Sequence, residues 1–586
     1  MPRIFTIHSP LGEELLLKSL VGDENLGSLF HFSLTLVSQR NSIQPKELLG
    51  KAVTIQIETE AKDFRFLNAQ VVSFKKTHEE ERYTEYRAEL MPWLWYTTRT
   101  SDCKIFLHKT VVQIIDEVLA DYPFPVKKKL SDTYKEIGYC VQYNETDFNF
   151  LSRLMEQEGI YYYFEHDDGQ HTLVLADYIS AHNPVPGHAM IRFVSADKVG
   201  TAGEECIRGW HVVESVKPGR FVTDDYDFKK PSANLQKTQN DPKKHDHANE
   251  EIYYWGQGYT DPGHGEHLTK VQLESLQLEQ EYARGETTVR RMAPGCTFTL
   301  YQHPDAAQNI EYLITGTAYH FHENPYATGH HGESTEWSIE FKGQKSSVQY
   351  RPTRVTPWPH IGGPQTAVVT GPKGQEIWCD KYGRVKVQFP WDRYGKYDEN
   401  SSCWIRASNP WAGSNYGSIH IPRIGQEVLV EYINGDPNRP IITGRVYNEE
   451  QMPPWELPAN ATQSGILTRS TPKGGYGNAN AIRFEDKKGA EQVWIQAERN
   501  MDIEVEHNET VTVKNDKTVS VSGFHKETVV KDMTVDVTKG KQVTTVESDI
   551  TITSKNGVIT LEIGASSITM TKDNIVIKSP RVDINP

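Results

Sequence analysis

Three glutamates around one predicted helix have the residue type and spacing for acid and base chemistry. The segment "ETDFNFLSRLMEQEG" (145–159) contains Glu145, Glu156 and Glu158, and a pair of carboxylates in unlike surroundings can act as general acid and general base. The chain has no GxSxG, HExxH or GxxxxGK[ST] motif that would add a nucleophile, a zinc site or a phosphate loop. We interpret the glutamates as a capping residue and a solvated helix face, and predict no catalytic residue.

Two histidine pairs have a spacing that suits metal ligands. His245 and His247 lie in "KKHDHANEE", and His264 and His267 lie in "DPGHGEH". Imidazole is a common ligand of zinc and other transition metals. Both pairs stand in polar, loop-like sequence without a partner motif. We therefore predict surface histidines, no metal site and no cofactor.

A third group combines basic and aromatic side chains, as in proteins that bind single-stranded nucleic acid. Its members are Arg384, Lys386, Phe389, Trp391, Arg393, Tyr394 and Lys396. Val385, Val387 and Phe389 alternate, however, as the buried face of a strand does. The net charge of −15 also argues against a general nucleic-acid binder, because phosphate contacts need clustered cations. We predict a structural use of this segment and no nucleic-acid partner.

The length and composition indicate a large, mostly β protein. At 586 residues the chain has room for three or four domains of about 100–200 residues each. Aromatic residues make up 10% of it, Gly and Pro are plentiful and long apolar helices are few. Six cysteines stand singly, which suits reduced thiols better than disulfides or zinc: Cys103, Cys140, Cys206, Cys296, Cys379 and Cys403.

The N-terminus "MPRIFTIHSPLGEELLLKSL" lacks the charged and apolar regions of a signal peptide, and no run approaches eighteen apolar residues. We therefore expect no Sec signal and no membrane span. If the protein leaves the cell, a dedicated machine must carry it.

The elements that would position these residues alternate strand-like segments with three predicted helices. Residues 111–122 and 145–159 have apolar side chains at helical spacing. The second segment has a cap candidate at Thr146 or Asp147 and a terminating Gly159. The third predicted helix, residues 268–292, is long and amphipathic.

Five short strand runs follow between residues 366 and 448: "TAVVTG", "GRVKVQFPWD", "SCWIRAS", "EVLVEYI" and "PIITGRVYN". Five strands joined by Gly, Asp and Pro turns predict a small closed barrel of the OB kind. Residues 449–480 are rich in Pro, Gly, Ser and Asn, which predicts a linker.

The C-terminal segment contains valines in pairs that recur almost every eight residues. We name these residues the valine ladder: Val505, Val511, Val513, Val519, Val521, Val535, Val537 and Val543. Val529 keeps the register and Glu527 breaks it once. Spacing by two within each pair predicts short strands with one buried face. The alternation resumes through Ile559, Leu561 and Ile563, then Ile568, Met570, Ile575 and Ile577.

Such strands carry too little apolar surface to close a core within one chain. A single-chain β-helix usually needs about twenty residues per coil, which an eight-residue repeat does not supply. Exposed strand edges must also be paired or covered. We therefore predict three chains wound around a shared axis, with the valine ladder as the core of the trimer.

Three segments carry a family resemblance that covers essentially the whole chain. They are "YCVQYNETDFNFLSRLMEQEGIYYYFEH" (139–166), residues 383–448 and "NAIRFEDKKGAEQVWIQAERNMDIEV" (480–505). The chain resembles the VgrG spike proteins of the bacterial type VI secretion system, which are similar to a fused phage tail hub and spike.

The resemblance implies a mainly β, multidomain fold. It comprises a hub-like base of two β-barrel subdomains with a few helices (1–365), an OB-fold barrel (366–448), the linker (449–480) and a triple-stranded intertwined β-helix needle in a homotrimer (481–586). As implied partners, the base would sit on an Hcp-type tube, and a PAAR-type cap protein and effector cargo would join the tip. The residues expected to dock the cap are Ile575, Ile577, Val582 and Ile584.

We accordingly expect a non-enzymatic spike that stays in the bacterial cytoplasm before firing. It is then delivered by the secretion system and passes transiently through the target membrane. We expect no enzymatic domain in the linker or after the needle. The alternatives are a cell-wall hydrolase and a trimeric β-helical adhesin, the latter disfavoured by the missing signal.

Overall fold

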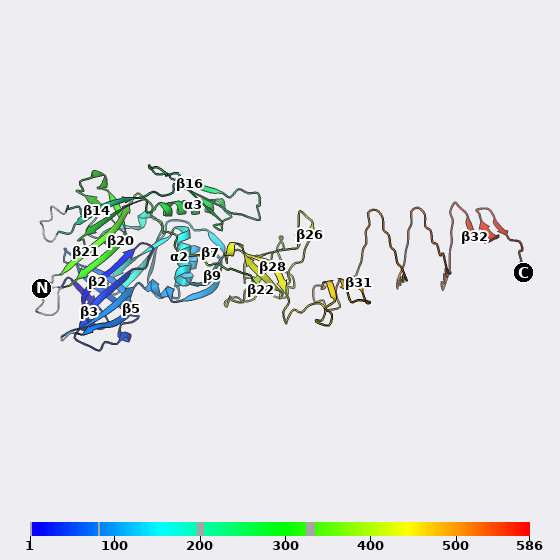
Figure 1. Ribbon diagram of the computed structural model, residues 1–586, viewed down its shortest axis with the longest axis horizontal. Coiled ribbons are helices and arrows are strands. Elements are labelled where there is room, and N and C mark those ends of the chain that lie inside the picture. Colours follow the sequence, from blue (N-terminus) through cyan, green and yellow to red (C-terminus); the bar gives the residue numbers. More distant parts are fainter. Residues whose placement is uncertain (1–2, 80–81, 196–203, 324–334, 586) are drawn as a thin grey trace. The chain divides into compact units, whose positions relative to one another are not determined.

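The computed structural model describes residues 3–79, 82–195, 204–323 and 335–585. The chain divides into two compact units, Met1–Arg499 and Asn500–Pro586. Figure 1 shows that arrows, the strands, greatly outnumber helices in the first unit. The mainly β class predicted from the composition is confirmed.

A thirteen-stranded sheet is the largest sheet of the first unit. Its main path runs β1 (Phe5–His8), β4 (Ala52–Glu58), β5 (Phe64–Glu79), β6 (Thr84–Met91), β3 (His31–Ser38), β2 (Leu16–Asn25), β20 (Glu311–His322), β21 (Glu336–Lys345), β18 (Glu281–Thr287) and β14 (Ile207–Glu214). Off this path, β12 (Asn183–Pro184) and β13 (Met190–Arg192) pair with β19 (Cys296–Tyr301), which pairs with β20.

Alternation of side chains explains how these strands build a core. In β3, Phe32, Leu34 and Leu36 are buried while the residues between them are more exposed, because successive side chains point to opposite faces of a sheet. The antiparallel pairing of β2 with β20 joins segments about 300 residues apart. The sheet is therefore continuous across this pairing, and the division of residues 1–365 into two barrels stays a prediction.

Two of the three predicted helices are confirmed. Helix α1 (Val111–Leu119) begins at a Thr110 cap that forms a capping box with Gln113. Helix α2 (Asp147–Glu158) begins at Thr146, whose hydroxyl accepts a hydrogen bond from the Asn149 amide. It ends at Gly159 with φ of 77°, a left-handed conformation that favours glycine.

The prediction of a helix over residues 268–292 is wrong in both of its boundaries. Helix α3 (Pro262–Gln277) begins at an Asp261 cap with proline in the first turn, six residues earlier than expected. Strand β18 occupies Glu281–Thr287, where Ala283, Gly285 and Thr287 are buried in alternation. The buried side chains of this segment recur every two residues, as in a strand, and not at the spacing of 3.6 residues that a helix requires.

Smaller elements complete the base. A two-stranded sheet pairs β7 (Ser101–Thr110) with β9 (Glu136–Thr146). Two three-stranded sheets have the strand orders β10 (Tyr161–Asp167), β11 (Gln170–Ala176), β8 (Val126–Lys129) and β16 (Lys237–Asn240), β15 (Arg220–Asp224), β17 (Glu251–Trp255). Short 3-10 helices are η1 (Gly12–Glu14), η2 (Pro45–Glu47), η3 (Trp93–Thr98), η4 (Ile179–Ala181), η6 (Ala306–Gln308) and, in the barrel, η7 (Ile433–Gly435).

All five predicted barrel strands are present. Their order is β23 (Lys386–Gln388), β22 (Gln365–Thr370), β27 (Glu427–Tyr432), β28 (Pro440–Val446) and β24 (Arg406–Ala407). An antiparallel bridge between Val385 and Ile405 links the two ends of this order and closes the barrel. A small hairpin, β25 (Trp411–Ala412) and β26 (Gly417–Ser418), projects from it.

A separate antiparallel sheet follows the barrel, with β30 (Ala481–Glu485) between β29 (Gln463–Leu467) and β31 (Gln492–Gln496). Strand β29 lies within the segment predicted as a linker, 449–480. The second unit contains one more antiparallel sheet, β32 (Ile559–Ile563), β33 (Ser566–Met570) and β34 (Ile575–Lys578). These last three strands coincide with the apolar alternation read in the sequence.

Candidate assembly surface

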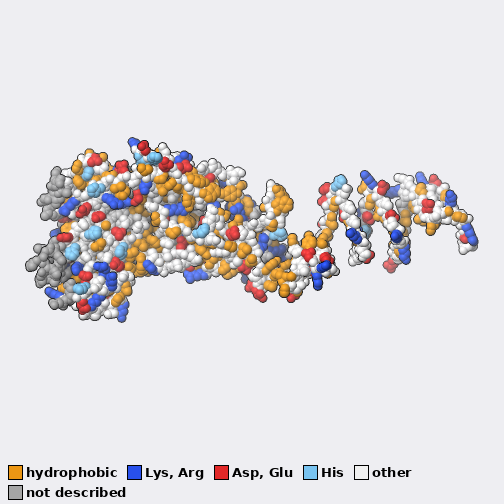
Figure 2. Space-filling view, viewed as in Figure 1, with side chains coloured by type: hydrophobic (Ala, Val, Ile, Leu, Met, Phe, Trp, Pro, Cys, Tyr) orange, Lys and Arg blue, Asp and Glu red, His pale blue; other side chains and the backbone are white. Residues whose placement is uncertain are grey.

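The valine ladder is exposed along its whole length in the single chain. The exposed fraction of its side chains runs from 46% for Val537 to 68% for Val543. Figure 2 shows charged side chains of both signs along the same unit. Burying a valine side chain stabilises a protein by roughly 1.5–3 kcal/mol, and these exposed valines do not contribute that stabilisation within the single chain. The ladder therefore presents apolar surface that the single chain leaves uncovered.

The backbone of the same segment is equally unsatisfied. Between residues 501 and 556, all of which the structure describes, no strand is assigned and no backbone amide donates to a backbone carbonyl. The short strands predicted here do not form within one chain. Backbone amides and carbonyls in native proteins are almost always paired, and unpaired extended chains readily add further strands. The exposed valines and the unpaired backbone of residues 501–556 are thus both features that pairing with further strands would satisfy.

The residues predicted to dock a cap are exposed as well. Ile575 and Ile577 in β34 are 65% and 55% exposed, and Val582 and Ile584 beyond it are 45% and 84% exposed. In the register of the sheet, Ile577 lies opposite Ile568, which lies opposite Leu561. This apolar row across three strands extends the predicted tip surface into β32 and β33.

The three glutamates that suggested chemistry are buried, so the prediction of a solvated helix face is wrong. Glu145 accepts hydrogen bonds from the fully buried guanidinium of Arg153, at 2.7 and 2.9 Å. Glu156 accepts from the Thr356 amide at 3.0 Å and the Thr356 hydroxyl at 2.7 Å. Burial raises the pKa of Glu156. Glu145 and Glu156 thus act as partners within the fold, and the capping role belongs to Thr146.

Glu158 joins the end of α2 to the first two turns of α3 through two histidines. His264 Nε2 lies 3.0 Å and His267 Nε2 lies 3.4 Å from its carboxylate oxygens. Burial alone would raise the pKa of Glu158, but the hydrogen bonds and charges of the two histidines outweigh it and lower that pKa to about 2. The Glu158 carboxylate in turn raises the pKa of His267. The group is a buried ion-pair cluster between helices.

The histidines thus fall into two kinds. His247 is exposed and pairs with Glu250 at 3.1 Å, as predicted for a surface residue. His264 and His267 are mostly buried against Glu158, so their placement on the surface is wrong. Within the described parts of the chain, no group of three or more His, Cys, Asp or Glu side chains is arranged to hold a metal ion.

Three of the four basic residues in the predicted group have partners within the chain. Lys386 donates to the Glu399 carbonyl at 2.6 Å, and Arg393 pairs with Asp102 at 2.9 Å. Arg384 pairs with Asp380 at 2.6 Å. The alternating face predicted as core is buried: Val385, Val387 and Phe389. Lys396 is exposed, but a lone cation does not make the charged groove that a nucleic acid needs.

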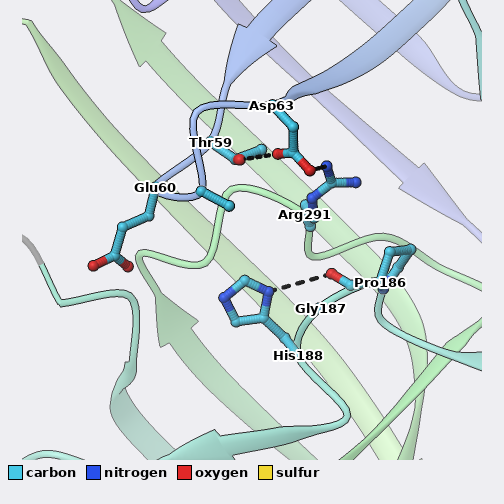
Figure 3. Close-up of a pocket in the computed structure, with 8 residues that line it drawn as sticks. Thr59, Glu60, Asp63, Pro186, Gly187, His188 and Arg291 are labelled. Carbon is cyan, nitrogen blue, oxygen red and sulfur yellow. Dashed lines mark hydrogen bonds and ion pairs between the residues drawn. The ribbon is translucent and has the colours of Figure 1, made fainter.

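A shallow cavity of about 430 Å³ lies between the β4–β5 turn and the segment around His188. In Figure 3, Asp63 lies between Thr59 and Arg291 and contacts both. His188 pairs with Glu205 at 3.1 Å, which raises the pKa of His188. Arg291 and His188 thus both have carboxylate partners. The cavity offers a surface of paired charges, and the Asp63 carboxylate that accepts a hydrogen bond from the Thr59 hydroxyl is held as an ion pair by Arg291.

Three family models match successive parts of the chain. The phage tail baseplate hub matches residues 23–325. The type VI secretion system and phage-baseplate injector OB domain matches residues 376–447. The bacteriophage T4 gp5 C-terminal trimerisation domain matches residues 464–576, a range that contains the whole valine ladder.

The relatives of this chain include type VI secretion system spike proteins. The chain is 45% identical over 507 residues to the type VI secretion system spike protein VgrG1c of Pseudomonas aeruginosa, covering 86% of this chain and 70% of the relative. It is 44% identical over 509 residues to VgrG1a of the same organism, covering 86% and 79%. It is also 30% identical over 546 residues to the actin cross-linking toxin VgrG1 of Vibrio cholerae, covering 90% of this chain and 48% of the toxin.

Solved structures share the fold. An E. coli type VI secretion component with structural similarity to T4 tail proteins gp27 and gp5 superposes with a TM-score of 0.53 at 19% identity, covering 74% of this chain and 97% of that one. A Francisella PdpA–VgrG complex gives 0.54 at 12% identity, covering 85% and 88%. Separately, no helix in the described residues has the length and apolar content to cross a membrane.

Proposed function

This chain belongs to the VgrG family of type VI secretion system spike proteins, and from that premise we propose that three copies form a structural, non-enzymatic spike with a tube at its base and a cap at its tip. The spike function itself is that of its relatives. The finer parts of the proposal are the trimer core, the two partners and the absence of catalysis.

One observation carries the proposal of an intertwined trimer. The backbone of residues 501–556 pairs with no other backbone segment of its own chain. The same residues expose valines at a period of eight and lie within the range matched by a trimerisation domain. Three such chains around one axis would bury the valines and satisfy the backbone. A needle in which every strand is paired has no soft element along its axis. That rigidity suits a part that must transmit axial force.

The partners follow from the positions of the remaining surfaces. The phage baseplate hub match over residues 23–325 supports docking of the base on a ring of an Hcp-type tube. The exposed apolar row Leu561, Ile568 and Ile577, with Val582 and Ile584, supports docking of a PAAR-type cap. An apolar strand end on a protein that travels through water needs such a cover. Effector cargo would travel with the cap or the spike.

The non-enzymatic part of the proposal rests on the candidate residues themselves. Each of Glu145, Glu156 and Glu158 is committed to a contact that holds elements of the base together. A general acid or base must instead reach a substrate proton. Purified protein should therefore not hydrolyse peptidoglycan. Hydrolysis that is abolished by Glu156→Gln would overturn this part.

We further propose that the protein waits in the bacterial cytoplasm and leaves it only through the secretion system. Fractionation of cells with and without a working secretion sheath tests this. The protein should appear outside the cell only when the sheath contracts. Its export in sheath-deficient cells would point to another route.

Mass measurement in solution tests the assembly. The particle should have three times the 66.7 kDa of one chain. A monomer at micromolar concentration would refute the trimeric spike. Deletion of residues 573–586 should leave the protein trimeric but abolish capture of the cognate PAAR-type protein. Equal capture by the full-length and shortened trimers would place the cap elsewhere.

A further inference from the structure

The sheet formed by β29, β30 and β31 has two unlike faces. Directly opposed residues in an antiparallel sheet share a face, and Ile466, Ile482 and Ile495 oppose one another across all three strands. Phe484 and Val493 form the next row on the same face. These five apolar side chains are 43–64% exposed, and the face includes no charged residue.

The opposite face is occupied within the chain. The Arg483 guanidinium stacks 4.9 Å over the Trp494 ring and donates to the Gln492 side chain at 3.1 Å. The connection between β29 and β30 is also tied to the barrel, because Glu376 accepts hydrogen bonds from the Thr471 hydroxyl and the Lys473 amide. The sheet is therefore formed and anchored in the single chain, and one face of it has no cover there.

The valine ladder has the opposite properties. It forms no backbone pairs within its own chain, so it can take shape only after other chains have arrived. Its repeat of eight residues also leaves the alignment ambiguous, because a slip of one repeat sets most valine pairs against valine pairs again. Register is weakly specified wherever alternative pairings bury similar side chains. Something outside the repeat must align the three chains.

We propose that the apolar face of β29–β31 is a contact between three copies of this chain, and that it aligns the chains before the valine ladder pairs. The inference deepens the proposed trimeric spike and rests on it. The occupant is the same face of the other copies, because the match to the trimerisation domain runs without a break from residue 464 through this sheet and the ladder. The sheet sequence is not repeated, so it admits one alignment only.

The placement of the sheet supports the same order of events. It comes immediately before the ladder in the chain, and it is preformed, so joining three faces costs little further ordering of backbone. Three identical apolar faces can close around one axis with cyclic symmetry. Pairing would then extend from the sheet toward the C-terminus.

A matched pair of variants in the full-length protein tests the proposal. Val493→Asp places a carboxylate on the apolar face, and Gln492→Asp places one on the opposite face of the same strand. Both positions are exposed in the single chain, so neither change should unfold it. After dilution from denaturant, Val493→Asp should recover trimer more slowly by about tenfold or more and yield aggregated or misaligned chains. Gln492→Asp should recover like the parent.

A milder change, Val493→Thr, keeps the shape of the side chain and should give an intermediate delay if Val493→Asp is poorly soluble. Equal assembly rates and trimer yields for Val493→Thr, Gln492→Asp and the parent would overturn the proposal. So would a Val493 variant that assembles normally but fails to bind another secretion component, because the face would then serve a different partner. A parent protein that is itself monomeric would instead refute the proposed function.

Discussion

The base and the C-terminal unit contain similar apolar residues but keep them in opposite environments. In the base, Phe32, Leu34 and Tyr319 are entirely buried among strands of the same chain. In the C-terminal unit, Val511, Val519 and their counterparts are about half exposed. Burial in the single chain thus distinguishes residues that stabilise the subunit from residues that, under the proposed trimer, would stabilise the assembly.

The two regions should therefore respond differently to protein concentration. A core within one chain unfolds with a midpoint that does not depend on concentration. A core shared by three chains is stabilised by mass action, so its midpoint rises with concentration. Each prediction below uses this distinction.

The largest effect should come from a charge in the valine ladder. Val519→Asp removes burial worth roughly 1.5–3 kcal/mol in each chain and places three carboxylates near one axis without partners. We expect complete loss of the trimer in light scattering, with the base still folded. Thr518→Asp, one residue away on the alternate face, should keep the trimer. If the two variants behave alike, the inward assignment of the ladder is wrong.

The next effect belongs to the base alone. Glu145→Gln removes the carboxylate charge that faces the fully buried Arg153. Leaving a buried charge unpaired costs about 3–5 kcal/mol, so the base should unfold earlier in denaturant, at a midpoint independent of concentration. Glu136→Gln removes the partner of an exposed histidine, His108, and should cost at most about 1 kcal/mol. A cost for Glu145→Gln as small as that of Glu136→Gln would contradict the assigned ion pair.

A smaller effect should appear in the dependence of base stability on pH. The folded pKa of Glu158 is lowered to about 2, so its contribution is present above the unfolded value of 4.5 and is lost as pH falls toward 2. The folded pKa of His267 is raised, so its contribution is present below the unfolded value of 6.5 and is lost as pH rises through the folded pKa. The contact between α2 and α3 should therefore stabilise the base most between about pH 4.5 and pH 6.5, where both contributions are present.

Glu158→Gln tests this window, because it removes the charge that both histidines face. The difference in unfolding free energy between variant and parent should be on the order of 1–3 kcal/mol near pH 5.5 and should shrink at pH 3 and at pH 9. A difference that stays constant from pH 3 to pH 9 would mean that the cluster does not titrate as a unit.

Apolar periodicity and helix-end residues in the sequence predicted the strands and helix ends that depend on neighbouring residues alone. The barrel strands, the Thr146 cap of α2 and the termination at Gly159 follow from alternation and from the chemistry of helix ends. The boundaries of α3 do not follow from its apolar spacing, because the helix starts at the Asp261 cap and Pro262, ahead of the apolar stripe. At its other end, the alternation of β18 competes with a helical pattern.

Contacts across long sequence separations explain the remaining errors. Glu158 meets His264 over 106 positions, and Glu156 meets Thr356 over 200. No residue near Glu156 or Glu158 in the sequence indicates these partners, so the local sequence alone predicts a solvated helix face for both. The valine ladder was visible because a repeat that has no partner in its own chain leaves its full pattern in the sequence. Its role in the trimer stays a prediction that the variants above can break.

The smallest effect concerns the one break in the ladder. Glu527 occupies a position where the repeat of eight residues calls for an inward valine, so three carboxylates should meet at one level of the needle. Glu527→Val would replace them with apolar contacts and should raise trimer stability by on the order of 1 kcal/mol per chain. The dissociation temperature at fixed concentration measures this. Thr528→Val, on the alternate face, should change it little. A fall in stability on Glu527→Val would instead mean that the carboxylates have partners in the needle, such as a cation or the neighbouring copies' lysines.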